Sequence, residues 1–277
     1  MKFKMLTITR GLYKIMECKI SVITVCRNAG NTIRETIESV FQQNYVNYEY
    51  IIIDGLSSDN TLQIAQSYRE QFASQNIMYK IISEEDNGIF DAMNKAADLA
   101  MGEWIIYMNA DDSFINNHVL SDISKYLYEQ YDVVYGNTMR IKGKEKFLAE
   151  ASPINKITKA MPFTHQSCLT KTMLIREYRF DLNYEVADYN LFLHLWLDGY
   201  QFLQTDVTIA NYSVEGYSNQ NKYKTYKSTL HIKHDFGLLN KDSLIQKIKN
   251  IYFRMLLDEN ILGHRVAKII WQKYHNS

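Results

Sequence analysis

Segments with the pattern of buried strands alternate with segments of helical periodicity along the first half of the chain. Short apolar, β-branched runs that have the length of strands occur at residues 20–25, 50–53, 77–82, 104–108 and 132–135. Between them, apolar residues recur with the spacing of amphipathic helices at residues 31–41, 61–72 and 89–100. Strands separated by helices predict right-handed βαβ units and a mostly parallel sheet, so we expect an α/β fold.

The second half of the chain has a less regular pattern. Residues 143–162 are expected to form a mobile connection, and a helix is expected to begin near Asp188, with Leu191 and Leu195 packed inward. From about Tyr223 the pattern indicates helices with basic faces. We therefore predict a main domain over residues 1–221 and a small, basic helical C-terminal extension over residues 222–277.

The formal net charge of zero hides an unequal distribution of charge. Residues 222–277 contain 11 Lys and Arg against 4 Asp and Glu, a net charge of +7, so the rest of the chain carries −7. Two interpretations of the basic extension stay open: it contacts an anionic membrane surface, or it forms a solvated helical face.

Composition and cysteine usage indicate the compartment. The three cysteines are an odd number at spacings that fit no metal knuckle, which favours a reducing environment. The apolar stretch near residue 10 is interrupted by charged residues, unlike a secretory signal, and no run approaches the 18 apolar residues of a membrane span. We therefore expect a cytoplasmic protein, with peripheral contact to the inner face of the membrane under the first interpretation of the extension.

Acidic residues follow three of the predicted strands. Asp54 comes directly after the second strand, Asp86 shortly after the third, and the pair Asp111 and Asp112 after the fourth. Open parallel sheets bind ligands beyond the carboxyl ends of their strands. These carboxylates are therefore expected to meet at one edge of the sheet.

A structural role is the competing explanation for each single aspartate, because Asp is a common helix cap and turn residue. Asp59 is expected to be only a cap, and for Asp86 capping and ligand binding both stay open. The adjacent pair Asp111 and Asp112 is harder to explain in this way, because neighbouring carboxylates repel each other unless a cation or strong donors offset their charge. Mn²⁺ or Mg²⁺ prefers such oxygen ligands.

A site of this kind suits displacement at a diphosphate leaving group. The divalent cation would bridge one carboxylate and the diphosphate, and the other carboxylates would accept hydrogen bonds from the ribose and the base. Transfer of a sugar also needs a general base near the acceptor hydroxyl. Asp188, at the predicted start of a helix, is the candidate base, and its competing role is that of an N-cap.

Four segments, taken in order, resemble family 2 glycosyltransferases. They are residues 20–28, 54–61, 86–94 and 102–112, and the likeness extends through His165–Gln166–Ser167 and Ala187–Asp188–Tyr189. That family has the GT-A fold, in which a mostly parallel sheet is flanked by helices, and its members invert the sugar they transfer. The resemblance therefore implies a glycosyltransferase that uses a nucleotide-sugar donor, in this family most commonly a UDP-sugar.

The resemblance also implies a role for each residue on the donor side. Val25 and Arg27 would lie against the nucleotide base. Asp54 would hold the base or the ribose, and Asp86 and Asn87 would line the nucleotide pocket.

The reacting centre is implied in the same way. Asp111 would lie toward the ribose, Asp112 would be the metal ligand and Asp188 the catalytic base. Asn109 replaces the first aspartate of the family's metal motif, and Ala187 replaces the glutamate that normally precedes the base. Metal binding therefore depends on the later pair of aspartates.

The segment of His165 and Gln166 resembles a motif on the acceptor or donor-sugar side. The pattern is similar to bacterial enzymes that build capsule, exopolysaccharide or lipopolysaccharide, which implies a sugar or lipid-linked saccharide as acceptor. Apolar residues within 245–256 form a stripe flanked by lysines, as expected of an interfacial helix on an anionic membrane. Packing of this stripe on the body of the protein is the other interpretation.

Other classes of protein fit the sequence less well. A metal-dependent nucleotidyltransferase would have a Gly-rich, basic phosphate loop after the first strand, where residues 28–31 are too sparse. An inactive nucleotide-sugar-binding protein would be expected to lack Asp112 or Asp188. These two classes stay as alternatives, whereas a dinucleotide oxidoreductase lacks its Gly-x-Gly-x-x-Gly motif and nucleic-acid binding lacks any recognition motif.

Overall fold

The computed structural model of the chain describes residues 19–213 and 222–239. Within them, one mixed sheet has the strand order β3-β2-β1-β4-β8-β6-β9-β5, with β7 paired to the outer part of β6. The strands are β1 Ile20–Cys26, β2 Tyr48–Asp54, β3 Met78–Ser83, β4 Trp104–Tyr107, β5 Ser113–Phe114, β6 Val133–Lys142, β7 Glu145–Ala149, β8 Cys168–Lys171 and β9 Phe202–Ser213.

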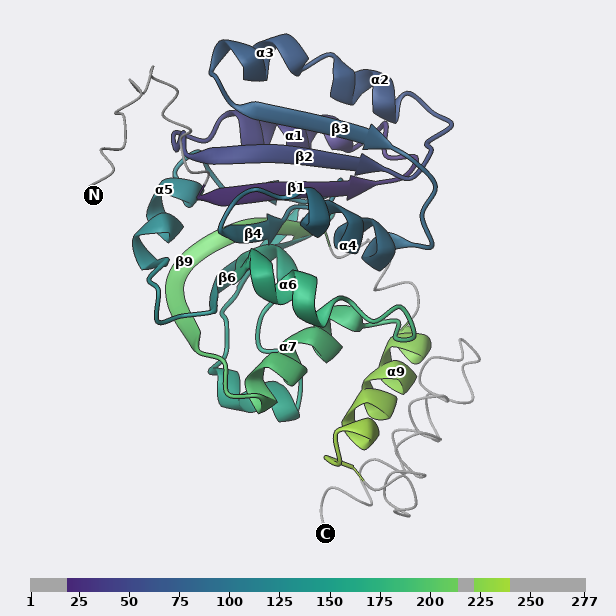
Figure 1. Cartoon of the computed structure of the whole chain (residues 1–277), viewed down its shortest axis with the longest axis vertical. Coiled ribbons are helices and arrows are strands. Elements are labelled where there is room, and N and C mark those ends of the chain that lie inside the picture. Colours follow the sequence, from purple (N-terminus) through teal and green to yellow (C-terminus); the bar gives the residue numbers. More distant parts are fainter. Residues whose placement is uncertain (1–18, 214–221, 240–277) are drawn as a thin grey trace, which may run out of the picture.

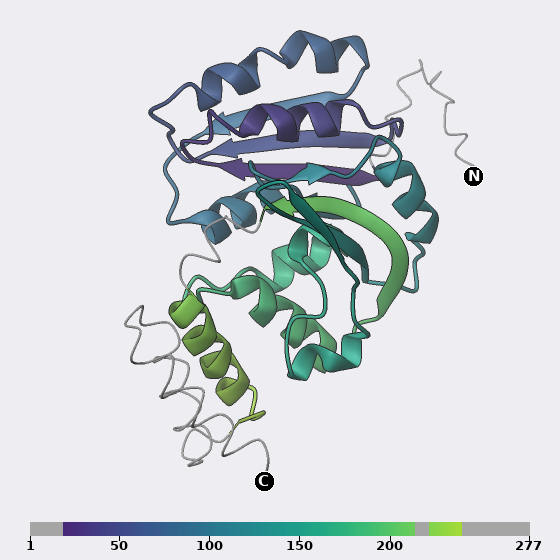
Figure 2. The same ribbon diagram turned by 180° about the vertical axis from the view of Figure 1, so that it is seen from behind.

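Helices cover both faces of this sheet (Figures 1 and 2). They are α1 Ile33–Phe41, α2 Thr61–Gln66, α3 Arg69–Ser74, α4 Ile89–Leu99, α5 Val119–Ile123, α6 Thr172–Tyr178, α7 Ala187–Leu197 and α9 Lys222–Asp235, with short 3₁₀ turns η1 Ser124–Tyr126, η2 Ile154–Thr158 and η3 His165–Ser167. The arrangement confirms the expected α/β fold with a helical segment near the C-terminus.

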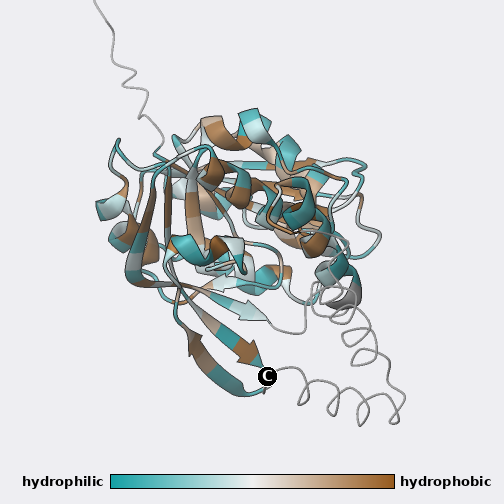
Figure 3. Cartoon of the chain, turned by 90° about the horizontal axis from the view of Figure 1, so that it is seen from below, coloured by the Kyte–Doolittle hydropathy of each residue, from teal (hydrophilic) through white to brown (hydrophobic). Residues whose placement is uncertain are grey.

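Two hydrophobic cores hold the layers together, one on each face of the sheet. Because side chains alternate along a strand, Val22 of β1 enters the core beneath α1, whereas Ile23 enters the core that contains Met93 of α4. The central strands are buried on both faces, which explains their nearly continuous apolar sequence. In Figure 3, several strands carry long brown stretches, and the helices carry bands of brown and teal.

The first half of the chain forms the parallel part of the sheet, as expected. Strands β1, β2, β3 and β4 pair in parallel, and their helical crossovers lie on the two faces. In the second half, β8 runs antiparallel between β4 and β6, and β9 pairs with β6 in parallel while curving around it. The sheet as a whole is therefore mixed.

Two local predictions were wrong. The helix expected over residues 61–72 is divided into α2 and α3 at Ser67 and Tyr68. Here Ser67 Oγ donates to the carbonyl of Ile64 (2.7 Å), and Tyr68 is buried with its hydroxyl donating to Glu38 (2.7 Å). The connection expected over residues 143–162 contains strand β7 and turn η2. Gly143 adopts a φ of 57° at the turn between β6 and β7, and this conformation lets the chain fold back as a hairpin.

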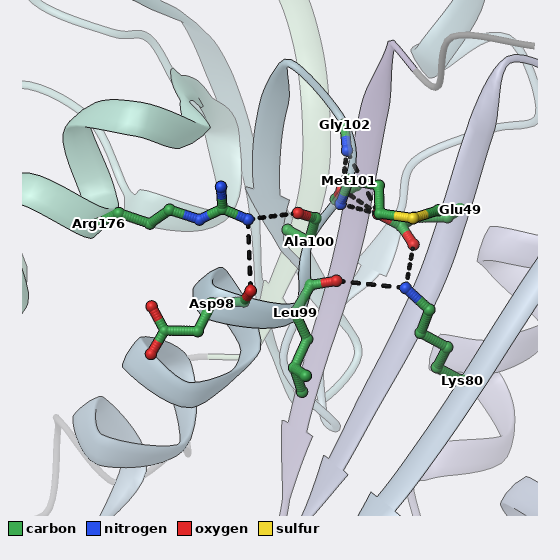
Figure 4. A network of polar contacts seen from close by, with 9 residues as sticks. Glu49, Lys80, Asp98, Leu99, Ala100, Met101, Gly102 and Arg176 are labelled. Atoms are coloured by element: carbon green, nitrogen blue, oxygen red, sulfur yellow. Dashed lines mark hydrogen bonds and ion pairs between the residues drawn. The ribbon is translucent and has the colours of Figure 1, made fainter.

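The C-terminal end of α4 is anchored at the amino edge of the sheet (Figure 4). The buried Glu49 carboxylate accepts hydrogen bonds from Ser21 Oγ (2.7 Å) and the backbone N–H groups of Met101 and Gly102, and it pairs with Lys80 Nζ at 3.0 Å. Lys80 also donates to the carbonyl of Leu99 (3.2 Å).

Arg176 of α6 contributes a second anchor by donating to the carbonyls of Ala97 (2.9 Å) and Ala100. These cations satisfy the carbonyls at the end of α4 and complement its dipole. The anchor fixes the position of the helix whose other end lines the candidate site.

Helix α9 packs on the body through Ile232, which is fully buried. Tyr184 Oη donates to Asp235 (2.8 Å), and the backbone N–H of Glu185 donates to Ser228 Oγ (3.1 Å). The apolar stripe within residues 245–256 lies outside the described residues, and the division of the chain at residue 221 stays a prediction. No helix of the described part has both the length and the apolar character that crossing a bilayer would require.

Candidate active site

The carboxyl ends of the parallel strands lie side by side. Cys26 of β1 is in register with Asp54 of β2, which in turn is in register with Ser83 of β3. Asp86 and the pair Asp111 and Asp112 follow within a few residues of the ends of β3 and β4. The fold therefore brings the strand-end carboxylates to one edge, as the sequence predicts.

A cavity of about 470 Å³ opens at this edge. Four of the residues predicted for the donor side line it: Val25 and Arg27 at the end of β1, and Asp86 and Asn87 before α4. The first turn of α4 and residues 182–185, which precede α7, form the rest of the wall. Its volume and mixed lining suit a small polar ligand with a flat apolar face.

Asp54 lies beneath the cavity and does not line it. Its side chain is 1% exposed and accepts hydrogen bonds from the backbone N–H of Ser57 (3.1 Å), the Ser57 hydroxyl and the Ser83 hydroxyl (2.7 Å). Through these contacts Asp54 stabilises the turn after β2. Direct contact of Asp54 with a base or ribose stays a prediction.

Gly55 allows two of the lining residues to approach this turn. A Cβ atom added at Gly55 would lie 2.3 Å from Asp86 Oδ2 and 3.5 Å from Arg27 Cδ. Any side chain at position 55 would therefore displace the Asp86 carboxylate. The glycine after Asp54 determines the shape of the cavity wall.

Asp112 is buried and held at both carboxylate oxygens. Gln166 Nε2 donates to Oδ2 (2.8 Å), and the backbone N–H of Ser213 donates to Oδ1 (3.3 Å). Burial and the neighbouring charge of Asp111 raise the pKa of Asp112 to about 7. Its carboxylate is therefore the one in this region whose ionised form most needs a compensating cation.

The Asp111 and Asp112 pair fits a hard divalent cation. Both supply carboxylate oxygens, Asp111 is exposed to solvent, and Mn²⁺ and Mg²⁺ prefer such ligands together with phosphate oxygens. The described residues contain no cluster of three or more His, Cys, Asp or Glu that could hold a metal by itself. The remaining ligands of a cation here would therefore have to come from a bound diphosphate or from water.

Asp188 and His165 form a pair next to these aspartates. His165 Nδ1 lies 3.0 Å from Asp188 Oδ2, and His165 Nε2 lies 3.0 Å from the side-chain amide nitrogen of Asn109. With the amide donating to Nε2, the imidazole carries its proton on Nδ1 and donates it to Asp188. Asp188 lies in the first turn of α7, which Val186 caps. Its oxygens accept from His165 and from its neighbour Tyr189, and no side-chain cap bond is present at this helix.

The environment keeps Asp188 ionised. Burial acts to raise the pKa of Asp188, but the hydrogen bonds from His165 and from the backbone N–H of Tyr189 outweigh it, so the pKa is lowered. An ionised carboxylate that is 21% exposed can accept a proton from a ligand that contacts it.

Two residues of the site carried no signal in the sequence. Tyr212 of β9 lies within electrostatic range of Asp112, Asp111 and Asp188, which together with burial raise the pKa of its phenol, whereas Arg140 of β6 lowers it. Arg140 is in register with Tyr212 across the β6–β9 pair. Only the pairing of these strands places the two residues beside the carboxylates.

The glycosyl transferase family 2 model matches residues 21–190, which is more than half of the chain. The chain belongs to glycosyl transferase family 2. The match includes every residue described above as lining the cavity or carrying a strand-end carboxylate, together with Asp188. It ends before β9, where Tyr212 lies.

Two relatives of the chain are bacterial proteins. It is 30% identical to a PGL/p-HBAD biosynthesis glycosyltransferase of Mycobacterium bovis over 121 residues, covering 43% of this chain and 46% of that protein. The match therefore spans about half the length of that relative. The chain is 28% identical over 226 residues to the UDP-Glc:alpha-D-GlcNAc-diphosphoundecaprenol beta-1,3-glucosyltransferase WfgD of Escherichia coli, covering 78% of this chain and 86% of WfgD.

A solved structure shares the fold. The mannosyltransferase PcManGT from Pyrobaculum calidifontis, in complex with GDP-Man and Mn²⁺, superposes with a TM-score of 0.64 at 17% identity, covering 94% of this chain and 75% of that chain. The likeness confirms the GT-A fold.

Proposed function

We propose that the chain is an inverting, metal-dependent glycosyltransferase that moves a sugar from a UDP-sugar to an acceptor hydroxyl in bacterial cell-surface polysaccharide biosynthesis. One observation carries the proposal: two consecutive residues hold the two reactive carboxylates. His165 contacts Asp188 (3.0 Å), and Gln166 contacts Asp112 (2.8 Å). The turn η3 thus keeps a candidate base and a candidate metal ligand at a common centre, beside a cavity of the right size for a nucleotide.

The relatives support the finer parts of the proposal. The name of WfgD states a UDP-sugar donor and a diphosphoundecaprenol-linked acceptor, and PcManGT is described with Mn²⁺. A lipid-linked acceptor supports the proposal that the enzyme works at the cytoplasmic face of the membrane.

In the proposed reaction, Val25, Arg27, Asp86 and Asn87 bind the nucleoside, and Asp111 and Asp112 bind Mn²⁺ or Mg²⁺. When bound, the cation supplies positive charge that stabilises the departing diphosphate. The proton transfer and the bond changes involve the side chains of the protein and its two substrates.

Asp188 takes the proton of the acceptor hydroxyl while that oxygen bonds to the anomeric carbon. The bond from this carbon to the diphosphate breaks, and the diphosphate leaves with the electron pair. Because attack comes from the face opposite the nucleotide, the anomeric centre is inverted. His165 orients Asp188 by donating its Nδ1 proton to Oδ2.

The base is tested by Asp188→Asn, measured by release of UDP with Mn²⁺ present. We expect turnover to fall by about 10²- to 10⁴-fold, the usual contribution of a general base, while the thermal shift caused by UDP stays close to that of the wild type. Asp206→Asn removes an exposed carboxylate of β9 and serves as the control. Wild-type turnover in Asp188→Asn would show that the base is another group.

The metal is tested by titration calorimetry of UDP with and without Mn²⁺. We expect Mn²⁺ to strengthen UDP binding to the wild type, and Asp112→Ala to abolish that gain. Equal affinity with and without Mn²⁺ in the wild type would refute the metal role.

A further inference from the structure

The hairpin of β6 and β7 carries a strip of unpaired positive charge. Arg140, Lys142, Lys144 and Lys146 are exposed, and Glu145 is the only acidic residue between positions 140 and 148. Across residues 19–213 and 222–239, none of these four cations forms an ion pair with a carboxylate. The strip therefore has a net charge of +3 that no ion pair within the described residues neutralises.

The same hairpin exposes large apolar side chains. Phe147 is 42% exposed and Leu148 is 49% exposed, on a strand whose one partner among the described strands is β6. Lysines alone would be explained as protection of an edge strand against aggregation. Exposed Phe and Leu side chains work against that protection, so the combination indicates a ligand that is both anionic and apolar.

The base of the hairpin adjoins the candidate active site. Arg140 is in register with Tyr212, and the next residue, Ile141, is in register with Ser213, whose backbone N–H donates to Asp112. From Arg140 to the turn at Gly143 the strand advances by about 10 Å at ~3.3 Å per residue. The cationic strip thus begins beside the carboxylates and leads away from them.

The position of the hairpin separates it from the donor cavity. That cavity lies at β1 and the start of α4, whereas β6 is three places further along the sheet, beyond β4 and β8. With the donor nucleotide at β1 and Asp188 at the centre, the hairpin lies on the side from which an acceptor must come.

We propose that the β6–β7 hairpin binds the diphosphate and the first part of the lipid of a polyprenyl-diphosphate-linked saccharide acceptor. This inference rests on the proposed glycosyltransferase function. Arg140 and Lys142 share one face of the hairpin and contact the phosphates by charge-assisted hydrogen bonds, and Phe147, paired opposite Arg140 on that face, contacts the lipid chain. The sugar, linked to the diphosphate, then extends from the base of the hairpin toward Asp188.

The test uses flotation of the full chain with phosphatidylcholine vesicles of three kinds: without additive, with undecaprenyl diphosphate, and with phosphatidylglycerol at equal total charge. The hairpin variant is Lys142→Gln/Lys144→Gln/Lys146→Gln. A matched control, Lys125→Gln/Lys156→Gln/Lys159→Gln, removes three exposed lysines elsewhere.

We expect the wild type and the control variant to bind undecaprenyl diphosphate vesicles in preference to both other kinds. The hairpin variant should lose this binding by about tenfold or more, given the attraction of each lysine to an anionic headgroup. Equal binding to phosphatidylglycerol vesicles would show a general anionic surface and overturn the proposal. Equal loss in the control variant, or none in the hairpin variant, would overturn it as well.

Thermal shift with UDP and Mn²⁺ separates this inference from the proposed function. The hairpin variant should keep the wild-type shift, because the donor cavity is at the other end of the site. A wild type without any shift would contradict the glycosyltransferase proposal itself. Weaker UDP binding in Arg140→Gln would assign that guanidinium to the donor and overturn the acceptor assignment.

Discussion

Glu49→Ala should strongly destabilise the fold, because Glu49 anchors the loop that follows α4. The carboxylate is 1% exposed, pairs with Lys80, and accepts hydrogen bonds from Ser21 and from the N–H groups of Met101 and Gly102. Replacement by alanine removes all of these acceptors at once and leaves the ammonium group and the N–H of Met101 without their partner.

The size of the effect depends on which of these donors keep another acceptor after the carboxylate is removed. Removing one partner of a buried ion pair costs about 3–5 kcal/mol. Lys80 is 31% exposed and keeps the carbonyl of Leu99, and Gly102 N–H keeps Ser21 Oγ at 2.9 Å, so the lower half of that range applies. We expect Glu49→Ala to lower the free energy of unfolding by about 3 kcal/mol. Glu49→Gln, which keeps one carbonyl oxygen, should cost about 1 kcal/mol.

Urea unfolding followed by circular dichroism measures both variants, with equal slopes required for a comparison of midpoints. Glu103→Ala is the control: it breaks an ion pair with Lys19 whose side chains are 30% and 46% exposed, and it should cost less than about 1 kcal/mol. The reasoning fails if Glu49→Ala is no more costly than Glu103→Ala, or if Glu49→Gln is as costly as Glu49→Ala.

Two further predictions concern the site. Gly55→Ala should raise the KM for the donor by about tenfold with little change in kcat, because its Cβ would displace Asp86 Oδ2, 2.3 Å away. In an Asp86→Ala background the same change should have no further effect on KM. Steady-state kinetics of the double-mutant cycle measure this, and a further rise in KM would show that the clash is not the cause. His165→Leu should move the acidic limb of the pH profile of kcat to higher pH, because it removes the interactions that lower the pKa of Asp188 and leaves burial, which raises it. Turnover at alkaline pH, where Asp188 is ionised in both proteins, should change far less. An acidic limb at the wild-type pH would contradict the pairing of His165 with Asp188.

The parallel half of the sheet could be predicted because its signals are local. Strands β1 to β4 are short apolar runs, and their helices have an apolar stripe, so the pattern within each segment is enough to assign it. The parallel order then places Asp54, Asp86 and Asp112 at one edge without knowledge of any contact. Of these three aspartates, Asp86 lines the cavity, together with Val25, Arg27 and Asn87, whereas Asp54 and Asp112 do not.

Local signals were misleading where tertiary contacts decide the backbone. Residues 61–72 have one continuous apolar stripe, yet the contact of Tyr68 with Glu38, 30 positions earlier in the chain, accompanies the break between α2 and α3. Residues 145–149 have no buried face and therefore no alternating apolar pattern in the sequence. They form a strand because their backbone pairs with the edge of β6.

The chain alone determines which carboxylates reach the edge of the sheet, since the positions of the strands and the parallel direction of the βαβ units follow from the pattern. It does not determine what those carboxylates touch. Gln166 meets Asp112 across 54 positions, and His165 meets Asp188 across 23. Such contacts depend on how β8 and β9 pair with the first half, and hydrogen bonds between segments so far apart leave no periodic trace in the sequence. Only the tertiary structure therefore places the turn at His165 and Gln166 between the two aspartates, and the hairpin with Arg140 beside them.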